Sequence, residues 1–324
     1  MGKLSSEEEF LTFIGSRKPS FQETDFQWIA DWGFDFVRIP MSYRCWSKPG
    51  SWSDMDETVL AQVDEAVEFG QRYGLHVSLN LHRAPGYCVN PPAEPQSLWT
   101  DARVLAAACH HWSAFAKRYS GIPAGRLSFD LLNEPPAPCD AMSRADYERV
   151  IRSLAGAIRE IDPSRPIIAD GLSWGNDPVP ELADLGVGQS CRAYMPMGIT
   201  HYKTPWVGGS RDFPVPQWPG GEHYGQVWDR PRLEAHYEQW GRLIARGVGV
   251  HCGEGGCYSE TPHAVFLSWF QDVLEILTGL GIGYALWNFR GSFGVLDSGR
   301  KDVSYRNWHG HSLDESLLKL LQKF

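Results

Sequence analysis

Short apolar segments alternate with longer amphipathic segments along nearly the whole chain, and this alternation limits the possible folds more than any other feature. The apolar runs have the length of strands buried on both faces, and the amphipathic stretches have the spacing of helices that cover a sheet. Eight strands are predicted, at 10–14, 36–40, 76–81, 127–132, 166–170, 197–201, 248–253 and 283–288. Helical patterns lie at 22–32, 55–73, 101–119, 143–161, 229–246, 262–280 and 312–323.

Repeated βα units indicate an α/β protein with a parallel sheet, and eight of them favour a closed (β/α)8 TIM barrel. The strand count alone does not exclude an open sheet. No linker or low-complexity tract interrupts the pattern, so residues 1–324 are predicted to form a single domain. The longest irregular stretch, 203–225, is rich in Gly, Pro and aromatic residues, and we interpret this loop after the sixth strand as a wall or lid over a site.

Composition indicates a neutral binding partner. The net charge is -9 and Lys and Arg do not cluster, which argues against nucleic acid. No apolar run approaches the roughly 20 residues that span a membrane. Aromatic residues make up 13% of the chain and include 14 Trp, and flat aromatic faces commonly bind neutral sugars. No obligate protein partner is inferred.

No cofactor is predicted either. The chain lacks the Gly-rich phosphate-binding patterns, and the candidate ligands His82 and His201 lie in no His-x-His or His-Glu-x-x-His motif, so neither a nucleotide nor a catalytic metal is expected. Seven scattered cysteines without Cys-x-x-Cys spacing indicate thiols in a reducing compartment. Residues 1–9 carry no apolar segment, so we expect a cytoplasmic protein, or a secreted one if a signal peptide has been removed.

Polar side chains gather where the predicted strands end. The clearest case is Asn133-Glu134, which follows an apolar run and precedes Pro135 and Pro136, residues that cannot continue a sheet. The carboxyl ends of barrel strands meet at one mouth, so residues far apart in sequence are expected to become neighbours there. The candidates are Arg38, His82, Asn133, Glu134, Asp170, His201, Tyr202, Glu254, Trp287 and Asn288.

Two of these candidates, Glu134 and Glu254, follow the fourth and seventh strands. Hydrolysis of a glycosidic bond needs such a pair, one carboxyl group to protonate the leaving oxygen and one to attack or stabilise the anomeric carbon. The same residues permit other readings, since His82, His201 and Glu134 are also possible metal ligands, although their spacing does not favour a metal.

Six motifs in this order resemble glycoside hydrolase family 5, the cellulase family of retaining (β/α)8 glycosidases. They are 33–40, 82–86, 132–135, His201, 253–256 and Trp287. The resemblance implies that Glu134 is the acid/base and Glu254 the nucleophile. It implies further that Asn133 binds the sugar 2-hydroxyl, Arg38 orients the nucleophile, His82 binds a hydroxyl, His201 supports Glu134 and Trp287 lies under the sugar ring.

The chain departs from this family at one contact to the nucleophile. The family has a Tyr two positions after its sixth-strand His, where this chain has Lys203, so Tyr202 is assigned that contact. The expected activity is retaining hydrolysis of β-1,4-linked glucosyl or mannosyl glycans or oligosaccharides through a covalent glycosyl-enzyme intermediate. Alternatives are an exo-acting β-mannosidase or β-glucosidase on short oligosaccharides and, from another class, a non-catalytic carbohydrate-binding barrel.

Overall fold

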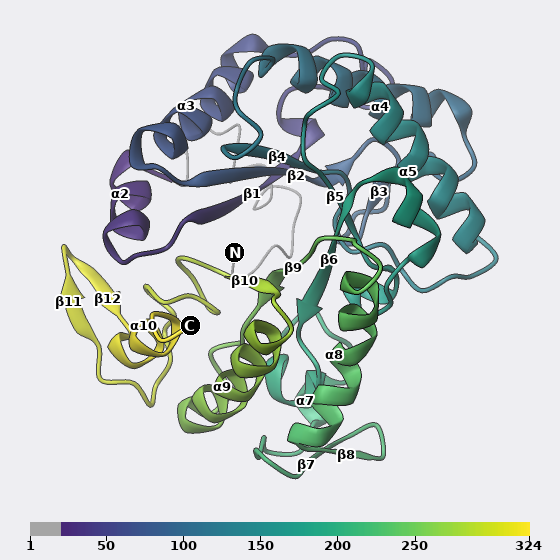
Figure 1. The fold of residues 1–324 in the computed structure, drawn as a ribbon. Coiled ribbons are helices and arrows are strands. Elements are labelled where there is room, and N and C mark those ends of the chain that lie inside the picture. Colours follow the sequence, from purple (N-terminus) through teal and green to yellow (C-terminus); the bar gives the residue numbers. More distant parts are fainter. Residues whose placement is uncertain (1–20) are drawn as a thin grey trace. The chain divides into compact units, whose positions relative to one another are not determined.

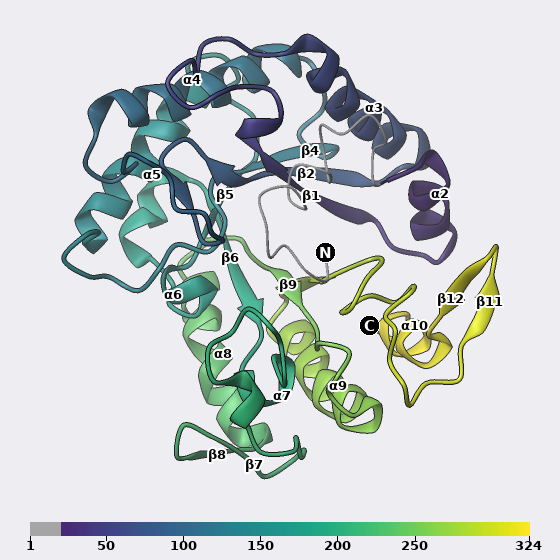
Figure 2. The same ribbon diagram turned by 180° about the vertical axis from the view of Figure 1, so that it is seen from behind.

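The computed structural model describes residues 21–324, and the strand predicted at 10–14 lies outside them. The described residues fall into two compact units. We call residues 21–190 and 247–249 the N-terminal unit, and residues 191–246 and 250–324 the C-terminal unit. Figures 1 and 2 show the chain from opposite sides, coloured from purple to yellow along the sequence.

A parallel sheet forms the centre of the N-terminal unit. Its order is β1 (Phe36–Ser42), β2 (His76–Ala84), β4 (Leu127–Asp130), β5 (Ile167–Asp170) and the first half of β6 (Gly188–Ala193), with β3 (Tyr87–Cys88) antiparallel to β2. The helices are α2 (Glu23–Asp31), α3 (Glu57–Tyr73), α4 (Ala102–Arg118), α5 (Arg144–Arg159) and α6 (Leu172–Gly175), with 3-10 turns η1 (Tyr43–Cys45) and η2 (Pro180–Leu185). The register sets Asn80 beside Asp130, which brings polar residues of two strands together.

Local sequence explains where these helices begin and end. The side chains of Asp101 and Ser143 accept hydrogen bonds from the first turns of α4 and α5. Gly74 ends α3 in the left-handed conformation that glycine adopts at little cost. The helices α3, α4 and α5 each bury an apolar face, and β2 is buried along almost its entire length, so the predicted βα pattern is confirmed in this unit.

The C-terminal unit continues the pattern. The second half of β6 lies beside β9 (Val250–Gly255), which pairs in parallel with β10 (Gly283–Leu286). Its helices are α7 (Met197–Thr200), α8 (Arg230–Ile244), α9 (His263–Gly279) and α10 (Glu315–Leu321). It also contains the turn η3 (Ser210–Asp212) and the hairpins β7 (Gly221–His223) with β8 (Gln226–Trp228), and β11 (Arg306–Trp308) with β12 (His311–Leu313).

The prediction of a strand at 197–201 is wrong, because residues 197–200 form the short helix α7. The sixth strand lies earlier, at Gly188–Ala193, in a segment whose Gln, Ser and Arg side chains hide its burial from a search for apolar runs. The loop predicted at 203–225 is also more regular than expected, since it contains η3 and β7, the first strand of the β7–β8 hairpin. Across residues 21–324, no helix combines the length and the apolar character needed to cross a membrane.

Candidate active site

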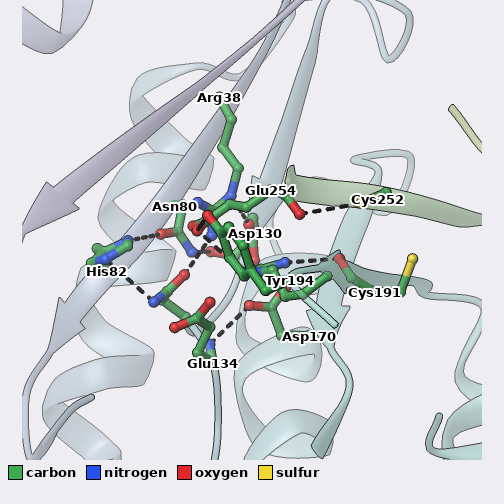
Figure 3. A network of polar contacts seen from close by, with 12 residues as sticks. Arg38, Asn80, His82, Asp130, Glu134, Asp170, Cys191, Tyr194, Cys252 and Glu254 are labelled. Atoms are coloured by element: carbon green, nitrogen blue, oxygen red, sulfur yellow. Dashed lines mark hydrogen bonds and ion pairs between the residues drawn. The ribbon is translucent and has the colours of Figure 1, made fainter. Parts of the chain in front are cut away.

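The backbone of Glu134 adopts an unusual conformation just beyond β4. Its φ is 52°, in the left-handed region that residues other than glycine seldom occupy. Its N–H donates to Asp170 Oδ2 at 2.8 Å, and its carbonyl oxygen accepts from the Tyr87 hydroxyl at 2.5 Å. Figure 3 shows the bond between Glu134 and Asp170 at the end of β5. Side chains from two other segments therefore hold the backbone that presents this carboxylate.

Burial raises the pKa of the Tyr87 hydroxyl well above its ordinary value, with the Glu134 charge acting in the same direction. Tyr87 therefore stays protonated and remains a hydrogen-bond donor to the Glu134 carbonyl. Asp170 is held in turn, since the Tyr147 hydroxyl donates to its backbone carbonyl oxygen. The carboxyl end of β5 thus supports the segment that follows β4.

Arg38, on β1, forms a buried ion pair with Asp130, on β4. Its Nε lies 2.6 Å from Asp130 Oδ2, and the two side chains are almost completely shielded from solvent. The Arg38 Nη2 donates to Asn133 Oδ1 at 2.9 Å. Since guanidinium nitrogens only donate, this bond fixes which end of the Asn133 amide is oxygen and which is nitrogen.

A chain of hydrogen bonds then sets the tautomer of His82. Asn80 donates through Nδ2 to the Asp130 carbonyl, so its Oδ1, 3.2 Å from His82 Nδ1, must accept. On the other side, the Asn133 amide nitrogen lies 3.3 Å from His82 Nε2 and must donate. His82 therefore carries its proton on Nδ1 and accepts at Nε2. Figure 3 shows the contacts of Arg38, Asn80, His82 and Asp130.

Glu254 lies on β9 in the C-terminal unit and is buried. One of its two partners, Arg192, lies on β6, and the other, Tyr194, directly follows that strand. The Tyr194 hydroxyl donates to Glu254 Oε2 at 3.0 Å, and Arg192 Nη2 lies 3.7 Å from Glu254 Oε1. The Arg192 side chain is 1% exposed, so water screens its charge very little. Each carboxylate oxygen of Glu254 thus has its own donor or cation. Figure 3 labels Tyr194 and Glu254.

His201 lies at the end of α7, and its ring contacts the rings of Tyr194 and Phe293. Burial lowers its pKa to about 4, against the opposing influence of the Glu254 charge. The Thr200 hydroxyl donates to the Tyr194 carbonyl and therefore accepts from His201 Nδ1, 2.9 Å away. His201 is thus a neutral imidazole at neutral pH with its proton on Nδ1.

The two glycines after Glu254 allow close packing. A Cβ atom on Gly255 would lie 2.6 Å from the Cβ of Ala193, and one on Gly256, whose φ is 149°, would lie 2.7 Å from the Trp287 carbonyl oxygen. Trp287 follows β10, is half-buried, and donates its backbone N–H to the Gly255 carbonyl at 2.8 Å. The glycines therefore bring β6, β9 and the Trp287 backbone close together around Glu254.

Within the N-terminal unit, the structure brings Arg38, His82 and Asn133 into one hydrogen-bond network. Asn133 directly precedes Glu134 in the sequence. Glu254 and His201 both lie close to Tyr194 in the C-terminal unit. The assignment of Tyr202 needs correction, because the phenol that bonds Glu254 is that of Tyr194. The Lys203 ammonium lies 4.8 Å from the centre of the Tyr202 ring instead.

Four residues of these networks were not singled out in the sequence: Asn80, Asp130, Arg192 and Tyr194. Tyr194 and Arg192 were missed because the sixth strand was placed too late in the chain. Their spacing was a usable signal, since Tyr194 stands two positions after Arg192 and so has the place of the family's tyrosine relative to its histidine. Among residues 21–324, no group of three or more His, Cys, Asp or Glu side chains is arranged to hold a metal ion.

Comparison with known proteins defines the class of fold and then the family. A solved structure described as a glycoside hydrolase is 40% identical, covers 95% of this chain and 94% of its own, and superposes with a TM-score of 0.92. The chain thus has the (β/α)8 fold of a glycosidase. Residues 7–292 match the model of the cellulases, glycosyl hydrolase family 5, and the chain belongs to that family.

Two curated relatives cover most of the chain. Endoglucanase C of Acetivibrio thermocellus is 26% identical over 324 residues, which span 92% of this chain and 91% of that protein. Cellodextrinase A of Ruminococcus flavefaciens is 27% identical over 276 residues, spanning 81% of this chain and 76% of that protein. The chain is therefore an enzyme that hydrolyses glycosidic bonds.

Proposed function

We propose that this chain is a retaining β-glycoside hydrolase that cleaves β-1,4-linked glucosyl chains and oligosaccharides, in the manner of an endoglucanase. The observation that carries the proposal is the held backbone of Glu134, directly after an Asn133 whose amide is oriented by Arg38. Family membership and relatives named endoglucanase and cellodextrinase support the choice of substrate.

In the first step, Glu254 attacks the anomeric carbon while Glu134 gives its proton to the glycosidic oxygen, which leaves as a sugar hydroxyl. The contacts of Glu254 with Arg192 and Tyr194 position the attacking carboxylate. Asn133 donates to the 2-hydroxyl of the sugar being cleaved, a contact that strengthens in the transition state and contributes several kcal/mol in such enzymes.

In the second step, Glu134 takes a proton from water, whose oxygen attacks the anomeric carbon and releases Glu254. Two inversions at that carbon return the original anomer. Retaining chemistry needs the two carboxyl groups about 5 to 5.5 Å apart. Trp287 provides an aromatic face for the sugar at the point of cleavage, in line with its role in the family.

The test separates the roles of the two glutamates. Cellohexaose and mannohexaose are incubated with the wild type, Glu134→Ala and Glu254→Ala. Activated aryl glycosides are incubated with the same three proteins, with and without azide. Azide should restore turnover of activated aryl glycosides in both variants, giving the β-glycosyl azide with Glu134→Ala and the α-glycosyl azide with Glu254→Ala. Glu181→Gln, a change at an exposed carboxylate bonded to Arg144, is the control and should leave activity unchanged.

Several results would overturn the proposal. Full activity in either alanine variant would remove that glutamate from catalysis. Proton NMR of the first-formed product should show the β-anomer, and an α-anomer would exclude retention. Preference for mannohexaose over cellohexaose would reject glucosyl specificity while leaving the roles of the glutamates in place.

A further inference from the structure

Two cysteine thiols lie deep inside the C-terminal unit, and neither takes part in the proposed mechanism. Cys191 lies on β6 and Cys252 on the neighbouring strand β9, and the two residues are 0% and 1% exposed. Their thiols are hydrogen-bonded to each other. Burial, together with this bond, raises the pKa of Cys191 well above its ordinary value. Cys191 therefore stays a protonated thiol, which donates a hydrogen bond and does not react as a thiolate.

The thiol of Cys252 is bonded in turn to the backbone of the proposed nucleophile. Its Sγ donates to the Glu254 carbonyl oxygen, with the two atoms 3.2 Å apart, and Figure 3 marks this bond. A thiol has one hydrogen, so Cys252 must accept from Cys191. Two successive hydrogen bonds thus run from the Cys191 thiol to the Cys252 thiol and on to the Glu254 carbonyl.

Strand β9 is irregular at the position of Glu254. The pair formed by Tyr284 and Cys252 is followed by the pair formed by Leu286 and Gly255. Strand β9 therefore advances by three residues where β10 advances by two, which makes a β-bulge that contains Glu254. A bulge redirects the side chains within it. The bond from Cys252 to the Glu254 carbonyl spans this bulge, so the thiol supports the backbone that aims the carboxylate.

The neighbouring strand β6 is held in a similar way. The Tyr237 hydroxyl, from α8, donates to the Arg192 carbonyl oxygen at 3.2 Å. Burial raises the pKa of Tyr237 well above its ordinary value, with the two nearby thiols acting in the same direction, so the phenol keeps its hydrogen. Arg192 and Glu254, whose side chains approach to 3.7 Å, thus each have a backbone carbonyl bonded by a buried side chain.

We propose that Cys252 is a positioning residue for the nucleophile, and this inference rests on the proposed role of Glu254. The Cys252 thiol holds the Glu254 backbone at the bulge, and the Cys191 thiol keeps the Cys252 sulfur oriented. Attack on the anomeric carbon requires close alignment, and a small displacement of the attacking group can cost a large factor in rate. Loss of the thiol hydrogen should therefore slow attack by Glu254 more than it weakens substrate binding.

A covalent label measures this attack directly. With 2,4-dinitrophenyl 2-deoxy-2-fluoro-β-cellobioside, a carboxylate oxygen of Glu254 bonds to the anomeric carbon and dinitrophenolate leaves with the electron pair, without a proton from Glu134. The fluorine slows hydrolysis of the new ester, so the label accumulates. Mass spectrometry counts the labelled chains, and release of dinitrophenolate gives the rate constant per labelled site. Loss of folded protein lowers the count, whereas a misplaced nucleophile lowers the rate constant.

The variants at Cys252 differ in whether they keep a hydrogen-bond donor. In Cys252→Ala we expect the labelling rate constant to fall by about tenfold, and the label concentration that gives half the maximal rate to stay within about twofold. Cys252→Ser keeps a donor and should recover most of the loss. Cys252→Val fills the space without a donor, so it should behave as Cys252→Ala does, and it serves if the alanine variant folds poorly.

The control is Cys257→Ala, which removes another fully buried thiol in the same unit, three residues after Glu254. It should label within about twofold of the wild-type rate. Cys191→Ala leaves the bond from Cys252 to Glu254 in place, so it should slow labelling less than Cys252→Ala does.

Each outcome decides between this inference and the proposed function. An unchanged rate constant in Cys252→Ala or Cys252→Val would overturn the positioning role. Equal losses in Cys252→Ser and Cys252→Ala would also overturn it, because the donor would then not be what matters. A wild type that takes up no label at Glu254 would overturn the proposed role of Glu254, and the inference with it. Normal labelling of Glu254 in the wild type combined with either of the first two results would overturn the inference alone.

Discussion

His82 Nε2 lies 3.3 Å from the amide nitrogen of Asn133. The other hydrogen bonds of the two side chains allow this contact to be a hydrogen bond in one way only, with Asn133 as the donor and His82 Nε2 as the acceptor. Arg38 requires the Asn133 oxygen to face it, and Asn80 requires the proton of His82 on Nδ1. A protonated His82 would direct an N–H at the Asn133 amide, which also donates. Asn80 is therefore linked to Asn133 by two successive hydrogen bonds, through His82, and helps to fix the orientation of the Asn133 amide.

Replacing Asn80 should disturb Asn133 through His82. In Asn80→Leu the Nδ1 proton of His82 loses its acceptor, so the imidazole is free to turn and the Asn133 amide loses its fixed partner. We expect kcat on cello-oligosaccharides to fall by about tenfold, the cost of one hydrogen bond in a buried network. Steady-state kinetics and a thermal melt on the same preparations measure the effect.

Two further variants separate this effect from general damage to β2. Asn80→Asp keeps an acceptor for His82 and should lose less activity than Asn80→Leu. Ser78→Ala changes a fully buried side chain two residues earlier on the same strand and should leave kcat within about twofold. Equal losses in Asn80→Asp and Asn80→Leu would show that the acceptor for His82 is not what matters.

Tyr194 and Tyr202 are the two candidates for the tyrosine that bonds Glu254, and we expect their replacement to affect catalysis differently. Tyr194→Phe removes the hydroxyl that donates to Glu254 Oε2, and a hydrogen bond to a charged group is worth about 1.5–3 kcal/mol. We expect kcat to fall by about ten- to a hundredfold. Tyr202→Phe should be nearly silent, because the phenol that bonds Glu254 belongs to Tyr194. Reversed effects in the two variants would restore the assignment made from the sequence.

The sixth strand was predicted too late in the sequence, at 197–201 and not at Gly188–Ala193, for a physical reason. Apolar runs predicted β2, β4 and β5 because bulky apolar side chains such as Leu79, Phe129 and Ile167 recur along these strands. β6 buries Gln189, Ser190 and Arg192 instead, since these side chains find polar partners inside the protein. The apolar segment that follows it was therefore taken for the strand, and Arg192 and Tyr194 were overlooked.

Glu134 and Asn133 could be predicted as candidate site residues from the sequence, but their geometry could not. The left-handed backbone of Glu134 depends on Asp170 and Tyr87, which are far away in the chain. No local pattern encodes this conformation, because Glu has no intrinsic preference for it. Tertiary hydrogen bonds impose it once β3, β4 and β5 have formed.

Arg192 supplies a buried positive charge beside Glu254, and its removal should slow catalysis. In Arg192→Met the carboxylate loses the cation that lies 3.7 Å from Oε1. We expect kcat on cello-oligosaccharides to fall by about tenfold, because a contact between charged groups in a buried site is lost. Arg192→Lys, which keeps the charge, should lose less activity. An unchanged kcat in Arg192→Met would remove Arg192 from this role.

Acid should destabilise the fold through His111, a buried residue of α4. The Trp46 indole N–H donates to His111 Nδ1 at 3.0 Å, so the imidazole is held neutral, and burial lowers its pKa to about 4. Between the ordinary histidine pKa near 6.5 and this value, the unfolded chain binds a proton that the folded chain does not. Stability from His111 is therefore complete above about pH 6.5 and decreases as the pH falls toward 4.

The variant His111→Gln keeps an acceptor for Trp46 but cannot titrate in this range. Urea unfolding of the wild type should show His111 costing about 2 kcal/mol of unfolding free energy between pH 7 and pH 5, and His111→Gln should lack that part of the decline. Part of the decline should remain, because burial also lowers the pKa of His201 to about 4. His110→Gln, a change at an exposed neighbour, should leave the decline as it is in the wild type. If His111→Gln lost stability with pH as steeply as the wild type, the acid sensitivity would have to be assigned to other groups.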